Sequence, residues 1–161
     1  MIELEIFYSK GCEGKVKLIE KTLKEVFEFI NIYIKANLEI PEFPGILNEK
    51  NQYDAVKLLK FLLKIEEGNR VLLIIKEDIY VSGMNFVFGL AQFHKGAVLS
   101  IYRLNSDELI EKEAIHEVGH VLGLYHCNNV CVMQFSNSLL EAKEKPKSLC
   151  ERCKKMLKYY N

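Results

Sequence analysis

The chain of 161 residues has no net charge, because 22 lysines and arginines balance 22 acidic residues. No apolar run approaches the roughly 18 residues that a membrane-spanning helix needs, and there are no repeats or low-complexity tracts. These absences argue against a polyanion-binding surface over the whole molecule, a membrane protein and a repeat protein. The length fits one domain with enough chain for a real core.

The chain also starts without the features of a secretory signal peptide. Met1 to Glu5 include no basic region ahead of an apolar stretch. We therefore expect a cytoplasmic protein whose thiols stay reduced.

Histidine is scarce, with four residues in the chain, yet three of them fall in one stretch that reads HEVGHVLGLYH. His116, His120 and His126, together with Glu117 and Gly123, have the spacing of a hydrolytic zinc site. His116 and His120 lie one helical turn apart, and Glu117 points about 80° away from their midpoint. Gly123 can end the helix in a left-handed conformation, which would turn His126 back toward the metal. Three nitrogens leave the fourth zinc position open, as catalysis requires.

The residues around this motif favour a helix. Ser106 can cap its start, and Asp107 and Glu108 suit the positive end of its dipole. One side of the helix gathers apolar residues, which we expect to pack on a core while the histidines face the opposite way. These residues are Ile110, Ala114, Ile115, Val118, Val121 and Leu122.

Four of the five cysteines form a second pattern: Cys127 and Cys131, then Cys150 and Cys153. Two such pairs fit a tetrahedral four-thiolate zinc site, which is closed and therefore structural. The alternative is two disulfides, but a reducing compartment favours metal. Ser148 looks like a helix N-cap, which would place Cys150 in a first helical turn, where the dipole favours thiolate.

The remaining candidates have simpler interpretations. Cys12 should be a small packed residue at the start of the first helix, and His94 should lie in a turn without a chemical role. The tail is basic, and we interpret its charges as a solvated helix face rather than a nucleic-acid patch. These residues are Lys143, Lys145, Lys147, Arg152, Lys154, Lys155 and Lys158.

The first hundred residues alternate between strand and helix patterns. Strand patterns cover 2–8, 32–38, 71–75, 86–93 and 97–102. Helical spacing runs from Val16 to Ile30, and again from Val56 to Leu63 with an end near Gly68. The pattern predicts an α/β protein, a layered βαβ-type sheet that leads into the helix of the histidine motif.

The histidine motif, the Cys131-Val132-Met133 sequence and the last cysteine pair together resemble the archaemetzincins, a branch of the metzincin metalloproteases. The resemblance covers nearly the whole chain and is most specific from 106 to 153. It implies that His116, His120 and His126 hold a catalytic zinc, that Glu117 is the general base, and that the four cysteines hold a structural zinc.

The resemblance also implies roles for three other places. Met133 would be the methionine that lies under the zinc histidines, in the Met-turn. Some metzincins have a tyrosine ligand two residues later, where this chain has Phe135. The strand near 86–92 would edge the cleft and pair with an extended peptide.

The fold that the resemblance implies is a metzincin-like layered fold, with a mixed, mostly parallel sheet packed by helices. We expect residues 1–161 to form a single domain. Residues 1–124 would be an N-terminal subdomain that ends in the active-site helix. Residues 125–161 would be a short C-terminal subdomain with the Met-turn and the zinc bound by four cysteines.

The resulting functional prediction is a zinc-dependent metallopeptidase with two Zn²⁺ ions per chain, in which a zinc-bound water attacks the peptide bond and Glu117 takes its proton. The expected partners are peptide or protein substrates, with no nucleic acid and no membrane, and the sequence carries no signal for an oligomeric state. The alternative is a non-catalytic zinc-binding module that only binds peptides.

Overall fold

The computed structural model describes residues 2–66 and 68–161 and contains a five-stranded sheet in the order β2-β1-β4-β7-β6. Four strands run parallel, namely β1 (Ile2–Tyr8), β2 (Ile30–Asn37), β4 (Arg70–Ile75) and β7 (Gly96–Ser100). The fifth, β6 (Gly89–Gln92), runs antiparallel to β7 at the open edge. The predicted α/β class with a mixed, mostly parallel sheet is confirmed.

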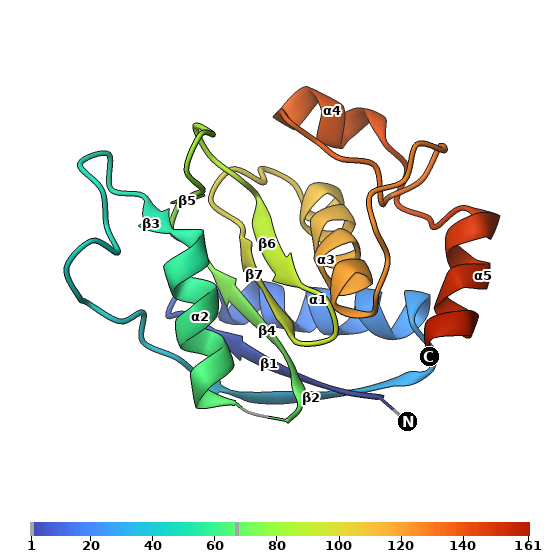
Figure 1. Cartoon of the computed structure of the whole chain (residues 1–161), viewed down its shortest axis with the longest axis horizontal. Helices are drawn as coiled ribbons and strands as arrows, with labels where there is room; N and C mark the ends of the chain where they lie inside the picture. Colours follow the sequence, from blue (N-terminus) through green and yellow to red (C-terminus); the bar gives the residue numbers. More distant parts are fainter. Residues whose placement is uncertain (1, 67) are drawn as a thin grey trace.

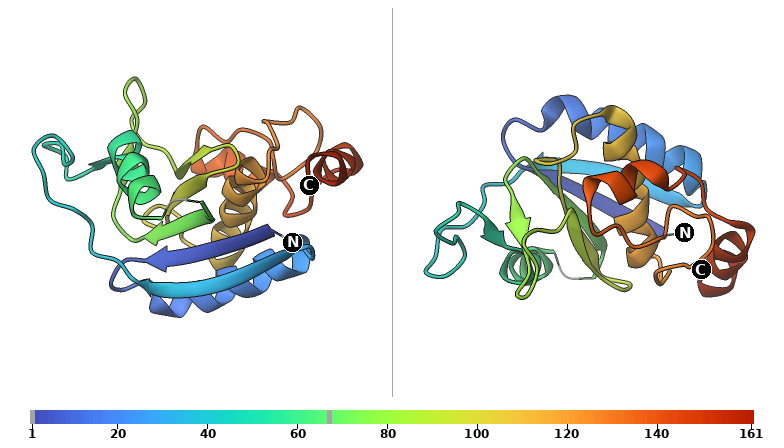
Figure 2. Two further views of the ribbon diagram at one scale, coloured as in Figure 1. Left: turned by 60° about the horizontal axis from the view of Figure 1, so that its bottom comes forward. Right: turned by 90° about the horizontal axis from the view of Figure 1, so that it is seen from above.

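Helices cover both faces of this sheet (Figures 1 and 2). Helix α2 (Ala55–Ile65) packs on one face, while α1 (Glu13–Val26) and α3 (Asp107–Val121) pack on the other. The alternation of side chains along β4 explains how one strand serves both layers. Val71, Leu73 and Ile75 point toward α2, whereas Leu72 and Ile74 point toward α1 and α3.

Two short helices complete the chain beyond α3. Figure 1 shows α4 (Leu139–Glu144) and α5 (Glu151–Tyr160) beside α3, on the side away from α2.

A second, two-stranded sheet pairs β3 (Tyr53–Asp54) with β5 (Ile79–Tyr80). Among residues 2–66 and 68–161, no helix combines the length and apolar character that crossing a membrane requires.

Several element boundaries differ from the sequence prediction. Helix α1 ends at Val26, and Ile30 begins β2, where it pairs with Ile2 of β1. Ile30 continued the helical spacing because it and Phe27 are buried in the same core from two different elements. The second helix ends at Ile65, short of the predicted end near Gly68.

The strand predicted over 86–93 is shorter than expected. Strand β6 begins at Gly89. Two residues earlier, the Val87 amide donates to the carbonyl of Ile79 at 3.1 Å, so Val87 pairs with β5 rather than β7. The predicted strand 97–102 is likewise observed as Gly96–Ser100.

Helix α3 begins and ends as the sequence predicted. The Ser106 side chain accepts the Leu109 amide at 3.2 Å. The helix stops where Gly123 adopts a φ of 106°, the left-handed region that glycine enters without strain. A Cβ atom at Gly123 would lie 2.9 Å from Cε1 of His94, so the space beside it is also filled.

Gly123 therefore faces both a backbone and a packing constraint. Replacing it with Ala should cost about 1–2 kcal/mol of unfolding free energy for the left-handed backbone and about 1 kcal/mol more for the displaced His94 ring. Gly83→Ala is the matched control, because Gly83 has a φ of 86° and open space around it. Urea denaturation that gives equal losses for the two variants would contradict the packing part.

Candidate metal centres

Helix α3 and the turn after it bring three imidazole rings together. Nε2 of His116 lies 3.1 Å from Nε2 of His120, one turn further along the helix. The turn at Gly123 returns the chain so that the ring of His126 lies 5.3 Å from that of His116 and 4.8 Å from that of His120. Ligand nitrogens of all three residues lie within 4.8 Å of one another. The spacing predicted in the sequence therefore becomes a cluster that can surround one ion.

Backbone carbonyls hold the two helical rings in position. Nδ1 of His116 lies 2.9 Å from the carbonyl oxygen of Val132, and Nδ1 of His120 lies 2.7 Å from that of Leu124. A carbonyl only accepts, so each Nδ1 donates its hydrogen, and each Nε2 keeps a lone pair directed at the cluster. This is the tautomer that a metal requires.

Burial keeps these rings neutral. It lowers the pKa of His116 well below its usual value and that of His120 to about 4, and it also lowers the pKa of the more exposed His126. The nearby Lys145 ammonium acts in the same direction on all three. Neutral imidazoles are the form that binds zinc.

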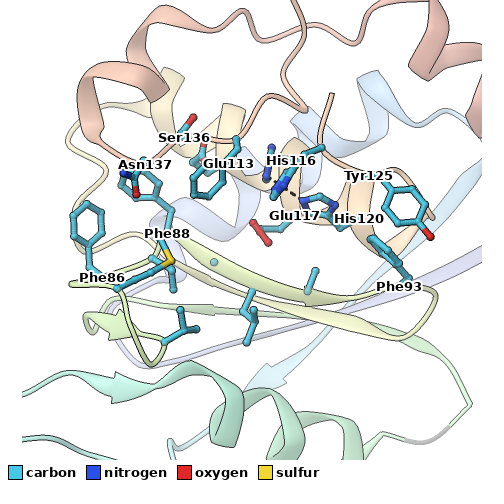
Figure 3. A pocket seen from close by; sticks show the side chains of 18 residues that line it. Phe86, Phe88, Phe93, Glu113, His116, Glu117, His120, Tyr125, Ser136 and Asn137 are labelled. Atoms are coloured by element: carbon cyan, nitrogen blue, oxygen red, sulfur yellow. Dashed lines mark hydrogen bonds between the residues drawn. The ribbon is translucent and has the colours of Figure 1, made fainter. Parts of the chain in front are cut away.

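Glu117 lies beside the histidines in a cavity of about 320 Å³ (Figure 3). Burial, and then the neighbouring Glu113 carboxylate, raise the pKa of Glu117 to about 8. Gly89 of β6 makes room for it, because a Cβ atom there would lie 2.6 Å from Cγ of Glu117. A carboxyl group with a pKa near neutrality, next to a cluster of metal-binding nitrogens, is suited to accept and return a proton.

Aromatic side chains and a strand form the walls of this cavity. Phe86 and Phe88 lie at one end, and Phe93 packs against Tyr125 at the other, with ring centroids 4.6 Å apart (Figure 3). Strand β6 lines the side opposite α3. Phe135 packs against His126 at 5.2 Å, and its ring offers no ligand atom where a tyrosine would.

Met133 packs underneath the histidine helix and is fully buried. A Cβ atom on Gly119 would lie 2.5 Å from Sδ of Met133, so the helix has a glycine where the sulfur approaches it most closely. The Met133 carbonyl also accepts the Cys127 amide at 3.0 Å. These contacts agree with a methionine below the rings, between the two clusters of the chain.

Four cysteines form the second cluster, with sulfur atoms within 4.8 Å of one another. Backbone amides of Asn129 and Met133 donate to the sulfurs of Cys127 and Cys131 at 3.4 Å in each case. The Cys150 amide donates to Cys131 at 3.3 Å. Such donors stabilise thiolates, and all five cysteines of the chain are free thiols rather than disulfides.

The pKa values of the thiols depend on their burial and on these hydrogen bonds. Burial raises the pKa of Cys131 and Cys153, because a thiolate needs a compensating positive charge in an apolar site. Burial also opposes ionisation of Cys150, but hydrogen bonds from the Cys153 amide and Asn129 outweigh it and lower its pKa to about 6. A bound dication would supply the missing charge.

One detail of this cluster was predicted wrongly. Helix α5 has Cys150, not Ser148, as its N-cap, and its first residue is Glu151. Cys150 therefore lies just before the first turn rather than in it. The Cys153 sulfur follows within that turn, so the pair still meets.

Two other candidates, Cys12 and His94, lie where the sequence predicted them. Cys12 is the N-cap of α1 and fully buried, with Sγ 3.6 Å from Oγ of Ser9. His94 lies in the turn between β6 and β7, where its amide donates to the Val121 carbonyl at 2.9 Å. That bond attaches the hairpin to the end of α3.

Sequence reasoning missed a buried ion pair beside the histidines. Lys145 was predicted to lie on a solvated basic face, but its side chain is completely buried and its Nζ lies 2.8 Å from Oε2 of Glu113. The other basic residues of the tail are exposed, as predicted. The sequence did offer one signal for Glu113. It precedes Glu117 by one helical turn, which places both carboxyl groups on the same face of the helix.

Comparisons with known proteins agree with this geometry. The sequence model of peptidase family M54 matches residues 8–159. An archaemetzincin of Nanoarchaeum equitans is 48% identical over 132 residues, covering 81% of this chain and 75% of that protein. An archaemetzincin of Archaeoglobus fulgidus is 44% identical over 119 residues, covering 68% and 71%.

Solved structures lead to the same group. The crystal structure of an archaemetzincin from Archaeoglobus fulgidus, complexed with malonate, superposes with a TM-score of 0.84 at 32% identity and covers 96% of this chain and 99% of that one. An archaemetzincin from Methanopyrus kandleri gives a TM-score of 0.84 at 32% identity, covering 99% and 94%. A zinc-dependent peptidase from Methanocorpusculum labreanum gives 0.76 at 26% identity, covering 96% and 99%.

The two clusters share one stretch of backbone, because His126 and Cys127 are adjacent. We therefore expect Cys127→Ser to weaken zinc binding at the histidine cluster by about tenfold or more, because the anchored backbone directs His126. Cys12→Ser, which removes a buried thiol outside the cluster, should leave that affinity unchanged. Zinc titration of Cys127→Ser that finds an undisturbed histidine site would refute the coupling.

Proposed function

The chain belongs to peptidase family M54, the archaemetzincins, and is a zinc-dependent metallopeptidase; we propose that His116, His120 and His126 hold its catalytic zinc and that Glu117 is the general base. The observation that carries this proposal is the convergence of three neutral imidazoles on one point beside a cavity. Carbonyls that fix Nδ1 of two rings leave the Nε2 atoms as ligands.

The donor set fits zinc at a catalytic position. Three histidine nitrogens can bind the ion, and Phe135 offers no fourth ligand. One side of the cluster therefore faces the cavity. Bound there, zinc supplies a Lewis acid that polarises the scissile carbonyl and lowers the pKa of water. The chain contributes the orientation of the rings and a partly enclosed site lined by aromatic side chains.

Glu117 then moves the proton. Its carboxylate accepts a proton from the attacking water and returns it to the leaving amine. Its place on α3, one residue after His116, directs it into the cavity rather than toward the ring cluster. Gly89 leaves the space that it occupies.

The substrate of this site is an extended peptide, in our proposal, bound along β6. The Ser100 amide donates to the Phe88 carbonyl, so the backbone groups of Phe88 face β7. Backbone groups alternate in direction along a strand, so those of Leu90 also face β7, while the amides of Gly89 and Ala91 face the open edge. Open strand edges bind peptides through the backbone, with side chains in pockets at alternate positions. The cavity between β6 and α3 receives the scissile bond.

The cysteine cluster is proposed to hold a second, structural zinc, for two ions per chain. Its four sulfurs would complete the coordination, so no position stays open for chemistry. Reduced thiols at these positions suit a reducing compartment, the cytoplasm. Residues 125–161 then act as a small zinc-bound subdomain against residues 1–124.

The role of Glu117 can be tested by Glu117→Gln, which keeps the size of the side chain but not its basicity. Peptide hydrolysis should fall by about 10²–10⁴-fold while both zinc ions are retained. Glu108→Gln, an exposed change at the start of the same helix, is the control and should keep activity.

Metal content by mass spectrometry and turnover of a diverse peptide library are measured together. A Glu117→Gln enzyme as fast as the wild type would remove this residue from the mechanism. A zinc-loaded wild type without chelator-sensitive turnover would instead support the non-catalytic peptide-binding module.

The binding mode can be tested by Ala91→Pro. Proline removes the outward amide of an edge strand, a position where the sheet itself loses no hydrogen bond. We expect KM for extended peptides to rise by roughly tenfold, as for one lost backbone hydrogen bond, with zinc content and thermal stability close to wild type. An unchanged KM would show that peptides do not pair with this edge.

A further inference from the structure

A buried ion pair lies directly behind the histidine cluster. Glu113 of α3 and Lys145, which follows α4, have side chains that are 3% and 0% exposed, and Nζ lies 2.8 Å from Oε2. At this distance the Lys145 ammonium lowers the cost of burying the Glu113 carboxylate. Lys112 of α3 holds the end of α4 against α3, since its Nζ donates to the carbonyl oxygen of Lys143 at 2.9 Å.

Stability alone does not explain such a pair. Taking two charges out of water costs about as much as their attraction returns, and apolar replacements of buried ion pairs are often as stable or more so. The other contacts of Lys145 point to a role at the histidine cluster. Its Nζ lies 3.3 Å from the Gln134 carbonyl and 3.4 Å from Nδ1 of His116.

Two groups thus compete for the same ring nitrogen. The Val132 carbonyl, at 2.9 Å, can only accept a hydrogen from Nδ1 of His116, whereas the Lys145 ammonium can only donate one to it. A neutral imidazole carries one ring hydrogen. If Nδ1 accepted from Lys145, that hydrogen would move to Nε2, the nitrogen that faces His120. The ring would then have no lone pair for a metal.

We propose that Glu113 is a positioning residue for the metal site: it binds the Lys145 ammonium and holds it away from His116, so that Nδ1 donates to Val132 and Nε2 stays free for zinc. The inference rests on the proposed role of His116 as a zinc ligand. The distances favour the contact with Glu113, since Nζ of Lys145 lies 2.8 Å from Oε2 of Glu113 and 3.4 Å from Nδ1 of His116.

The chain contains a matched control. Glu111 and Lys147 form a second ion pair between the same two segments, with Nζ 3.0 Å from Oε2, but Lys147 is 46% exposed. Each of these residues lies two positions from its counterpart in the buried pair. Glu111→Gln removes the same charge from the same helix without releasing a buried ammonium beside the ring.

The first test measures zinc affinity at fixed pH by competition with a chromophoric chelator. Cobalt substitution separates the two sites, because thiolate-to-cobalt charge-transfer bands report only the cysteine cluster. Glu113→Gln should weaken the histidine site by about 10–100-fold, the range found for groups that orient metal-binding histidines. Glu111→Gln should leave it unchanged, and the cysteine site should not respond to either variant.

Rescue is the decisive arm. In the Glu113→Gln/Lys145→Met double variant the ammonium is gone, so affinity at the histidine site should return to within about threefold of wild type if the freed ammonium was the cause. A double variant as weak as Glu113→Gln would overturn the proposal, as would Glu113→Gln with wild-type affinity. If Glu113→Gln does not fold, Lys145→Met alone decides: wild-type or tighter affinity supports the proposal, and a tenfold loss overturns it.

A second readout needs neither zinc in the histidine site nor activity. In ¹⁵N NMR spectra of protein loaded only at the cysteine site, wild-type His116 should carry its hydrogen on Nδ1. Glu113→Gln should move it to Nε2, and the double variant should move it back. Peptide hydrolysis does not enter these measurements, so a failure of the proposed peptidase activity and a failure of this inference are distinguishable.

Discussion

The site depends on two hydrogen bonds from imidazole rings to backbone carbonyls. Nδ1 of His116 donates to Val132, and Nδ1 of His120 donates to Leu124. Helix geometry brings these rings to one face, but it does not decide which nitrogen of each ring points at the cluster. The carbonyls decide it, because they can only accept. Everything proposed for the chemistry follows from the lone pairs that remain.

Three consecutive residues connect the two clusters. Cys131 contributes a sulfur to the cysteine group, the Val132 carbonyl orients His116, and Met133 packs beneath the helix against Gly119. A shift of this strip would disturb all three contacts at once. We therefore expect the cysteine cluster to act on the histidine cluster through the backbone, which would give a physical reason for its position immediately after the third histidine.

Helix α3 carries unusual charges for a buried element. Glu113 and Glu117 both face the cavity, one turn apart, and their environments differ. Lys145 forms an ion pair with Glu113, whereas Glu117 has no such partner among residues 2–66 and 68–161, and burial raises its pKa to about 8. These different environments suit the two carboxyl groups to the different roles proposed for them, one electrostatic and one in proton transfer.

Features controlled by local geometry could be predicted from the sequence. The i, i+4 spacing of His116 and His120, the cap at Ser106 and the left-handed turn at Gly123 follow from helix stereochemistry, so they could be predicted from neighbours in the chain. Periodicity also identified the α/β class. It failed at Ile30, because a buried residue in a strand can continue the spacing of the helix before it.

The contacts between distant groups depend on how the whole chain packs. The burial of Lys145 against Glu113, the carbonyl of Val132 at His116 and the space that Gly89 leaves for Glu117 join residues far apart in the chain. A lysine among exposed lysines carries no local sign of burial. Whether a charge is paired inside the protein depends on how the segment after α4 packs on α3, and long-range packing is not encoded in spacing.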